Sequence, residues 1–62
     1  MLTPRKAYRR MYSEVYKATY KSERAAGQPT ENARHTARLE AELQARAEYN
    51  ALRWWDAQHR VR

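Results

Sequence analysis

The sequence contains no cysteine, no phenylalanine, one glycine and two prolines. Without cysteine the chain has no disulfide, no thiolate metal site and no cysteine nucleophile. One glycine is too few for a glycine-rich phosphate loop. No apolar run approaches the about 20 residues that span a bilayer, and the first residues lack the apolar core of a signal peptide. These absences predict a soluble, cytoplasmic protein.

Residues that could perform chemistry are few and scattered. His35 and His59 would lie about 36 Å apart along one helix, because a helix rises 1.5 Å per residue, so they cannot share a metal ion. Ser13 and Ser22 have no histidine close in sequence that could activate them. We therefore expect no catalytic residue, no metal and no cofactor, and the protein is not expected to be an enzyme.

Helix-breaking residues divide the chain once. Thr3 can cap a helix that Pro4 opens. Gly27 can supply the left-handed residue that ends this helix, and Pro29 or Thr30 can open the next. Because so short a loop makes the helices antiparallel neighbours, the fold class predicted is all-α, an antiparallel two-helix hairpin. The expected ranges are one domain over 1–62, with a helix over about 4–26, a turn over 27–30 and a helix over about 31–59.

A two-helix hairpin of this size is expected to need completion. A chain of 62 residues removes only about 60% of its unfolded surface from water when it folds, so its stability alone is marginal. Leu39, Tyr49 and Leu52 fall outside the main seam between the two helices. These leftover apolar residues predict self-association, as in a homodimeric four-helix bundle, or docking on a different protein.

The seam expected on the second helix is made mostly of small residues, which would let the helices approach closely against a tyrosine-rich partner. Glu40 on this seam is expected to reach out to water or to pair across the hairpin with an arginine or a tyrosine hydroxyl, for which Tyr12 and Tyr16 are the candidates. Trp54 and Trp55 are expected to return near the start of the first helix and close the open end, against Leu2, Tyr8 and Met11. The expected seam is Ala33, Thr36, Ala37, Glu40, Leu43, Ala47, Ala51, Trp54, Gln58 and Val61.

Tyrosines recur at every fourth position of the first helix, at Tyr8, Tyr12, Tyr16 and Tyr20. Helical spacing places them in one slanting row. Tyr8 and Tyr12 share a side with Met11 and are expected to pack. Tyr16 and Tyr20 lie at the border with the basic side, where packing and partner binding are both open roles.

The positive charge is concentrated in the first half. Residues 1–27 carry seven Lys or Arg against two Glu, a net +5, whereas residues 28–62 carry six Arg against five acids, a net +1. On the second helix, opposite charges at i, i+4 are expected to neutralise the outer face, at Arg38–Glu42, Glu42–Arg46 and Asp56–Arg60. Uncompensated like charge on the first helix predicts a functional surface. The partner-binding residues predicted are Lys6, Arg9, Arg10, Tyr16, Lys17, Tyr20, Lys21 and Arg24, together with Trp54 and Trp55.

These features favour binding over chemistry. The leading hypothesis is an interaction protein that docks on the acidic surface of a larger protein or nucleoprotein complex, as an inhibitor, adaptor or structural subunit. The alternative is a helical-hairpin dimer that binds the backbone of DNA or RNA without sequence preference. Binding to a membrane surface is less favoured, because the first helix has few large aliphatic side chains to insert.

The expected architecture, a helical hairpin of about sixty residues, looks like that of small plasmid RNA-binding hairpin dimers and of one small ribosomal protein. No motif carries this likeness, so no residue role transfers from it. The small size and the abundance of alanine and arginine are also typical of small phage or mobile-element proteins.

Overall fold

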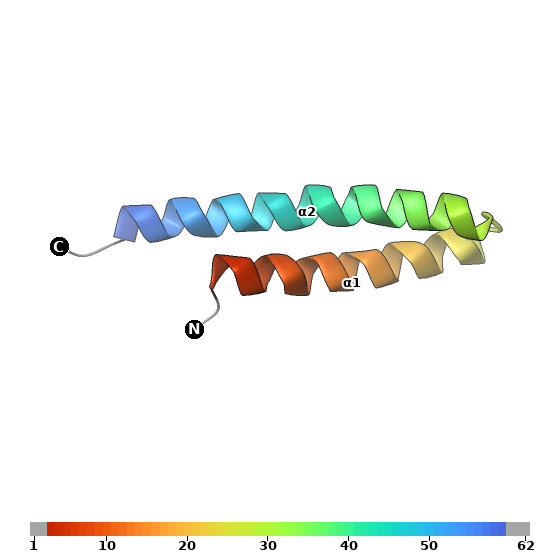
Figure 1. The fold of residues 1–62 in the computed structure, drawn as a ribbon, viewed down its shortest axis with the longest axis horizontal. Coiled ribbons are helices and arrows are strands. Elements are labelled where there is room, and N and C mark those ends of the chain that lie inside the picture. The colour runs from red at the N-terminus through yellow and green to blue at the C-terminus, as the bar shows by residue number, and fades with distance from the viewer. Residues whose placement is uncertain (1–2, 60–62) are drawn as a thin grey trace.

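The computed structural model describes residues 3–59 and shows two antiparallel helices, α1 (Pro4–Ala25) and α2 (Thr30–His59). The helices lie side by side along their length, in a rod 53 Å long and 17 by 13 Å across (Figure 1). The all-α hairpin predicted from the sequence is confirmed. The observed bounds differ from the expected ones by one residue, at Ala25 and at Thr30.

The first helix begins at a side-chain cap. Thr3 has an extended backbone, with φ of −76° and ψ of 159°, and its Oγ1 accepts a hydrogen bond of 3.2 Å from the backbone N–H of Lys6. Pro4 follows at the first helical position, where the missing N–H costs no helical hydrogen bond. The Thr3-Pro4 start therefore arises from local chemistry, as the sequence predicts.

The turn between the helices is a Schellman motif built on the single glycine. Gly27 has φ of +92°, a conformation that side chains disfavour. Its N–H donates to the carbonyl of Arg24 and the N–H of Gln28 donates to the carbonyl of Glu23, both at 3.0 Å. The Arg24 guanidinium also donates to the carbonyl of Gln28 at 3.0 Å. These bonds end α1 and reverse the chain within a few residues.

The buried core consists of alanine alone. Among residues 3–59, the buried hydrophobic residues are Ala7 on α1 and Ala33, Ala37, Ala41 and Ala45 on α2. The four on α2 recur at every fourth position, as do the tyrosines of α1, which are half-buried. Rows of residues four apart form ridges that fit into the grooves of a partner helix. The hairpin therefore packs a tyrosine-rich helix against alanines, as the sequence predicts.

The seam expected on α2 is wrong over most of its length. Ala33 and Ala37 are buried and Thr36 is half-buried, but the buried row then continues through Ala41 and Ala45. Leu43 is 69% exposed, because it follows Ala41 by two residues, about 200° around the helix. The other expected members that are exposed are Glu40, Ala47, Ala51, Trp54 and Gln58, and Val61 lies outside the described residues. Because α2 has alanines on several sides, a helical pattern of small residues can also be fitted to a side that α1 does not cover.

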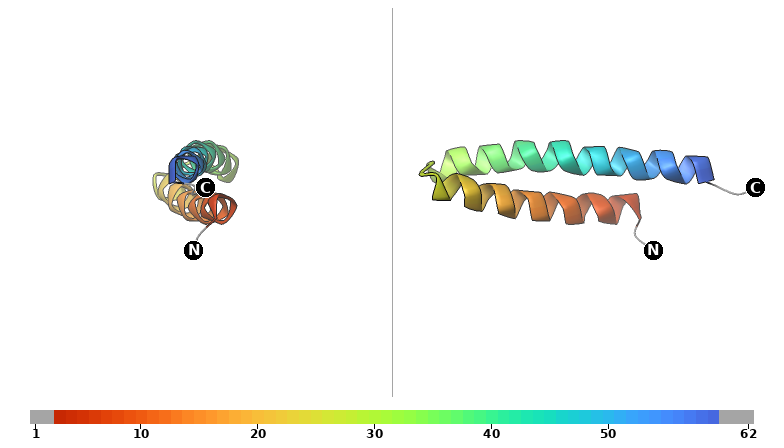
Figure 2. Two further views of the ribbon diagram at one scale, coloured as in Figure 1. Left: turned by 90° about the vertical axis from the view of Figure 1, so that its left-hand side faces the viewer. Right: turned by 180° about the vertical axis from the view of Figure 1, so that it is seen from behind.

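The open end of the hairpin also differs from expectation. Trp54 and Trp55 are 63% and 51% exposed and do not close it. Trp54 follows the buried Ala45 by nine residues, about 180° around the helix, so it is directed away from α1. The end of α2 runs past the start of α1 (Figure 2). Tyr49 is expected outside the seam, but it is half-buried near the open end, and its ring contacts the ring of Tyr8. Leu52 is half-buried too, whereas Leu39 is exposed as predicted. Leu2, the other expected neighbour of the tryptophans, lies outside the described residues.

Among the described residues, most of the polar pairs considered for α2 do not form. Glu40 is exposed and accepts a hydrogen bond of 3.3 Å from Gln44, so of its expected roles it takes the one that reaches out to water and does not pair with a tyrosine hydroxyl of α1. Within residues 3–59, no ion pair joins Glu42 to Arg38 or to Arg46. Exposed ion pairs gain little energy against water and side-chain entropy, which accounts for their absence. The third predicted pair includes Arg60, which lies outside the described residues.

Candidate interaction surface

The tyrosines of α1 form a continuous stack. The ring centroids of Tyr8 and Tyr12 are 6.1 Å apart, those of Tyr12 and Tyr16 are 6.1 Å apart, and those of Tyr16 and Tyr20 are 6.3 Å apart. The angle between successive ring planes falls from 27° to 17° and then to 6°. Each inner ring therefore has a neighbouring ring on both sides, which orders the whole row. We call these four residues the tyrosine stack.

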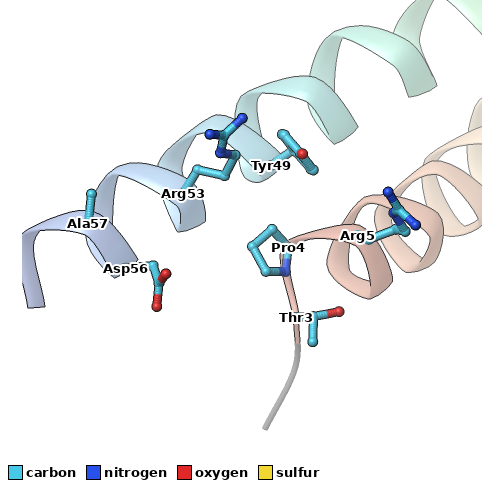
Figure 3. Close-up of a pocket in the computed structure, with 7 residues that line it drawn as sticks. All are labelled: Thr3, Pro4, Arg5, Tyr49, Arg53, Asp56 and Ala57. Carbon is cyan, nitrogen blue, oxygen red and sulfur yellow. The ribbon is translucent and has the colours of Figure 1, made fainter. Parts of the chain in front are cut away.

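A fifth tyrosine joins the stack from the other helix. Tyr49 on α2 meets Tyr8 edge to face, with centroids 6.2 Å apart and ring planes at 90°. The guanidinium carbon of Arg53 lies 5.8 Å from the centroid of the Tyr49 ring, within cation–π range. Figure 3 shows Arg53 and Tyr49 side by side on α2, with Arg5 across from them on α1. Aromatic and cationic groups from both helices thus meet near the open end.

Arginines from both helices surround this tyrosine contact. Arg5 and Arg9 of α1 and Arg46 of α2 line a shallow groove together with Tyr8, Tyr49 and Asn50. A second groove continues along α1 between Arg9, Ser13 and Lys17 and the first three rings of the tyrosine stack. We call this surface the arginine–tyrosine face; its residues are Arg5, Tyr8, Arg9, Tyr12, Tyr16, Lys17, Arg46, Tyr49 and Arg53.

The charge on this face is largely uncompensated. Within residues 3–59, the ion pair that forms joins Arg10 Nε to Glu14 Oε2 at 3.7 Å, between two exposed side chains. Arg5, Arg9 and Arg46 form no ion pair with a described acidic residue. Guanidinium groups present a planar fork of N–H donors that matches carboxylate and phosphate oxygens. The face is therefore suited to bind anionic groups.

The tyrosine hydroxyls add polar groups to the same face. Among the described residues, no hydrogen bond involves the hydroxyl of Tyr8, Tyr12, Tyr16, Tyr20 or Tyr49. None of these oxygens is a buried atom without a partner, so they lie within reach of solvent. A tyrosine with a half-buried ring and a hydroxyl at the surface is a frequent anchor of protein interfaces.

The structure brings some of the predicted binding residues together and separates others. Arg9, Tyr16 and Lys17 belong to the arginine–tyrosine face, and Tyr20 ends the tyrosine stack. Lys6 and Lys21 are exposed on α1. Two of the predicted cations have local partners, since Arg10 pairs with Glu14 and Arg24 donates to the turn. Their roles in binding stay predictions.

The predicted tryptophans lie apart from this face. Trp54 and Trp55 are exposed near the end of α2. The Trp55 ring stacks on His59, with centroids 4.0 Å apart and planes at 14°, and His59 Nδ1 lies 2.9 Å from the Trp55 carbonyl oxygen. The exposed tryptophan and leucine side chains of α2 are typical of a surface that binds a partner.

Six members of the arginine–tyrosine face are absent from the residues predicted to bind a partner. Tyr8 and Tyr12 are predicted to pack, and Arg5, Arg46, Tyr49 and Arg53 have no predicted binding role. One signal could have found the residues of α2. Tyr8 lies 17 residues before Ala25 and Tyr49 lies 19 residues after Thr30, so the two residues are at nearly the same distance from the turn and their rings fall near each other. Arg53 follows Tyr49 by one helical turn, and Arg46 precedes it by about one.

Comparison of the chain with protein-family models, with curated proteins and with solved structures finds no match. Within residues 3–59, no group of three or more His, Asp or Glu side chains is placed to hold a metal ion. Neither described helix has a stretch that is both long and apolar enough to cross a membrane. The candidate surface therefore has to be interpreted from its own chemistry.

Proposed function

We propose that this chain is a non-enzymatic interaction protein that docks through its arginine–tyrosine face on an acidic surface of a larger protein or nucleoprotein complex. In this role it acts as an inhibitor, adaptor or structural subunit. The observation that supports the proposal is the gathering of Arg5, Arg9 and Arg46, from two helices and without an ion pair among the described residues, around the Tyr8–Tyr49 contact. Holding these three positive charges close together lowers the stability of the free protein, and a bound anionic partner offsets this loss.

The tyrosine stack favours a protein surface over nucleobases. The centroids of successive rings in the tyrosine stack are 6.1–6.3 Å apart, so a base could insert between two of these rings only by spreading the row. The hydroxyl groups and ring edges remain available, and they suit carboxylate and carbonyl acceptors. Tyrosine beside arginine is also the composition of interface hot spots.

Binding to a nucleic-acid backbone is the second candidate. The observation that favours it is the charge of α1 and its flanks, where residues 3–29 hold seven Lys or Arg against two Glu. Phosphate oxygens accept the same forked hydrogen bonds as carboxylates. Such binding would be independent of sequence and would weaken steeply as the salt concentration rises.

A pair of matched variants tests the proposal. Arg9→Glu with Arg46→Glu reverses two charges on the face, and Arg34→Glu with Arg38→Glu makes the same change at exposed residues of α2 outside it. We expect the first pair to weaken binding to polyglutamate at least about tenfold at low salt, since each lost charged hydrogen bond is worth ~1.5–3 kcal/mol. The second pair is expected to bind almost as well as the unmodified chain.

Two outcomes would change the assignment. Equal weakening by both pairs would mean that net charge, and not the face, drives binding. If duplex DNA or RNA binds more tightly than polyglutamate and depends on Arg9 and Arg46, the second candidate replaces the first. Substituting Lys17, Lys21 and Arg24 with glutamate and measuring the change in affinity then shows how far the binding surface extends along α1.

A further inference from the structure

A strip of exposed apolar side chains runs along α2. Leu39 is 50% exposed, Leu43 is 69% exposed and Trp54 is 63% exposed, and the alanines between them, Ala47 and Ala51, are exposed as well. At about 100° per residue these five positions fall within about 120° of the helix circumference, an arc that they share with the exposed Glu40 and Asn50. Leu43 lies nearly opposite the buried Ala41, so the strip is directed away from α1. We call it the leucine–tryptophan strip.

The hairpin alone buries no large side chain completely. All five of its buried hydrophobic residues are alanines, and no large side chain is fully buried in the described part of the chain. A buried methyl contributes about 0.8 kcal/mol, whereas a fully buried Leu contributes ~1.5–3 kcal/mol. Covering Leu39, Leu43 and Trp54 is therefore the largest gain in hydrophobic stability left to this fold, and small folds often obtain it by association.

Charge indicates what can cover the strip. The chain carries +6 overall, but α2 holds four Arg against five acidic residues, a net −1, while residues 3–29 hold a net +5. Two copies that meet through α2 keep their positive α1 helices apart. Contact through α1 would instead bring two strongly positive surfaces together. A second copy therefore fits the strip and does not fit the arginine–tyrosine face.

We propose that the leucine–tryptophan strip is the interface of an antiparallel homodimer centred on Ala47. Leu43 lies four residues before Ala47 and Ala51 four after it, so an antiparallel partner sets each leucine against an alanine. Leu39 lies eight residues before the centre and Trp54 lies seven after it, so at each end the leucine of one copy comes near the tryptophan of the other. Large side chains thus meet small ones near the centre, where the helices come closest, and the larger pairs fill the two ends.

Charges beside the strip select the antiparallel orientation. Glu42 precedes Ala47 by five residues and Arg53 follows it by six, and the two lie on the same flank of the helix, about 20° apart. In an antiparallel dimer the Glu42 carboxylate of each copy comes beside the Arg53 guanidinium of the other, giving two pairs. A parallel dimer would hold the Glu42 of one copy and the Arg53 of the other eleven residues apart along the helix axes, about 16 Å, so neither pair would form.

The dimer does not rest on the proposed function, and the two surfaces share only Arg46 and Arg53. Arg53 and Arg46 lie at the border between the strip and the arginine–tyrosine face, since Arg46 also lines a hollow with Leu39, Glu42 and Leu43. Arg5, Arg9 and the tyrosine stack lie on α1, which the second copy does not cover. The dimer therefore presents two copies of the α1 part of the face to an anionic partner.

The molar mass in solution tests the proposal, measured by sedimentation equilibrium over a range of concentrations. We expect the unmodified protein to reach twice its 7.5 kDa chain mass. Ala47→Glu should raise the dissociation constant at least about 100-fold, because it sets two carboxylates together at the centre and like charges in an interface cost several kcal/mol. Ala18→Glu, the same change at an exposed position of α1, should leave dimerisation intact. A protein that stays at 7.5 kDa, or an Ala47→Glu variant that dimerises normally, overturns the proposal.

Loss of the dimer can also unfold the chain, so the melting temperature of the unmodified protein provides a second readout. For a folded dimer, Tm rises with protein concentration by mass action. A Tm independent of concentration overturns the proposal even if Ala47→Glu is unfolded by circular dichroism.

Orientation is tested by disulfide trapping, which is clean because the chain has no cysteine. Leu43→Cys and Ala51→Cys variants are mixed and mildly oxidised, and the products are identified by mass. The antiparallel dimer gives mainly the mixed disulfide, because position 43 of one copy faces position 51 of the other. Products that each contain two copies of one variant would show a parallel dimer and overturn the assigned geometry.

Discussion

The ring of Tyr8 meets the ring of Tyr49 at 90°, with centroids 6.2 Å apart, and this contact joins the tyrosine stack of α1 to α2. It fixes the register of the two helices at the open end, far from the turn. It also places Arg5 and Arg9 of one helix beside Arg46 of the other. A single aromatic contact therefore connects the packing of the hairpin with the surface proposed to bind a partner.

The Tyr8–Tyr49 contact is expected to couple the two residues energetically. In a double-mutant cycle with Tyr8→Ala and Tyr49→Ala, we expect a coupling energy of ~0.5–1.5 kcal/mol, the range for edge-to-face aromatic pairs. Urea denaturation at one protein concentration provides the measurement. The matched cycle with Tyr20→Ala and Tyr49→Ala should give a value near zero, since Tyr20 stacks on Tyr16 near the turn. Equal coupling in the two cycles would contradict the observed register.

Replacing Ala41 with leucine is expected to destabilise the hairpin by ~1–3 kcal/mol, because a fully buried alanine leaves no room for the larger side chain. Ala18→Leu at an exposed position of α1 should change the free energy of unfolding by less than about 0.5 kcal/mol. Thermal and urea denaturation measure both variants. A neutral Ala41→Leu would mean that the buried row lies elsewhere on α2.

Gly27→Ala is expected to cost about 1 kcal/mol of stability. No atom lies within 4 Å of the Cβ that it adds, so the cost comes from the backbone, whose φ of +92° disfavours any side chain. Gly27→Asn should cost less, because asparagine adopts left-handed conformations more readily. The comparison of the two free energies of unfolding checks this, and a larger loss for asparagine would point to crowding instead.

Thr3→Ala is expected to lower stability by ~0.5–2 kcal/mol, through loss of the side-chain acceptor for the Lys6 N–H. Thr3→Ser keeps an oxygen at this position and should retain most of the stability. Hydrogen exchange gives a local readout, since the amide of Lys6 should exchange faster in the alanine variant than in the serine variant. Equal exchange in both variants would show that the cap contributes nothing.

The sequence by itself determined the two helices, the turn and the distribution of charge. Thr3-Pro4 and Gly27 act on neighbouring backbone groups, so their effects can be predicted without knowing what the helices contact. The basic character of α1 follows directly from its Lys and Arg residues. The four-residue tyrosine spacing likewise predicts one row on one helix.

Only the tertiary structure decided which side of α2 is buried. Alanines occur on several sides of this helix, and burying one row of methyl groups gains about as much as burying another. The tyrosine row of α1 selects the row Ala33, Ala37, Ala41 and Ala45, whose four-residue spacing matches its own. That choice exposes Leu43 and Trp54 and brings Tyr49 to Tyr8. Both proposed surfaces depend on it, because each is made of residues that the packing of one helix on the other leaves uncovered.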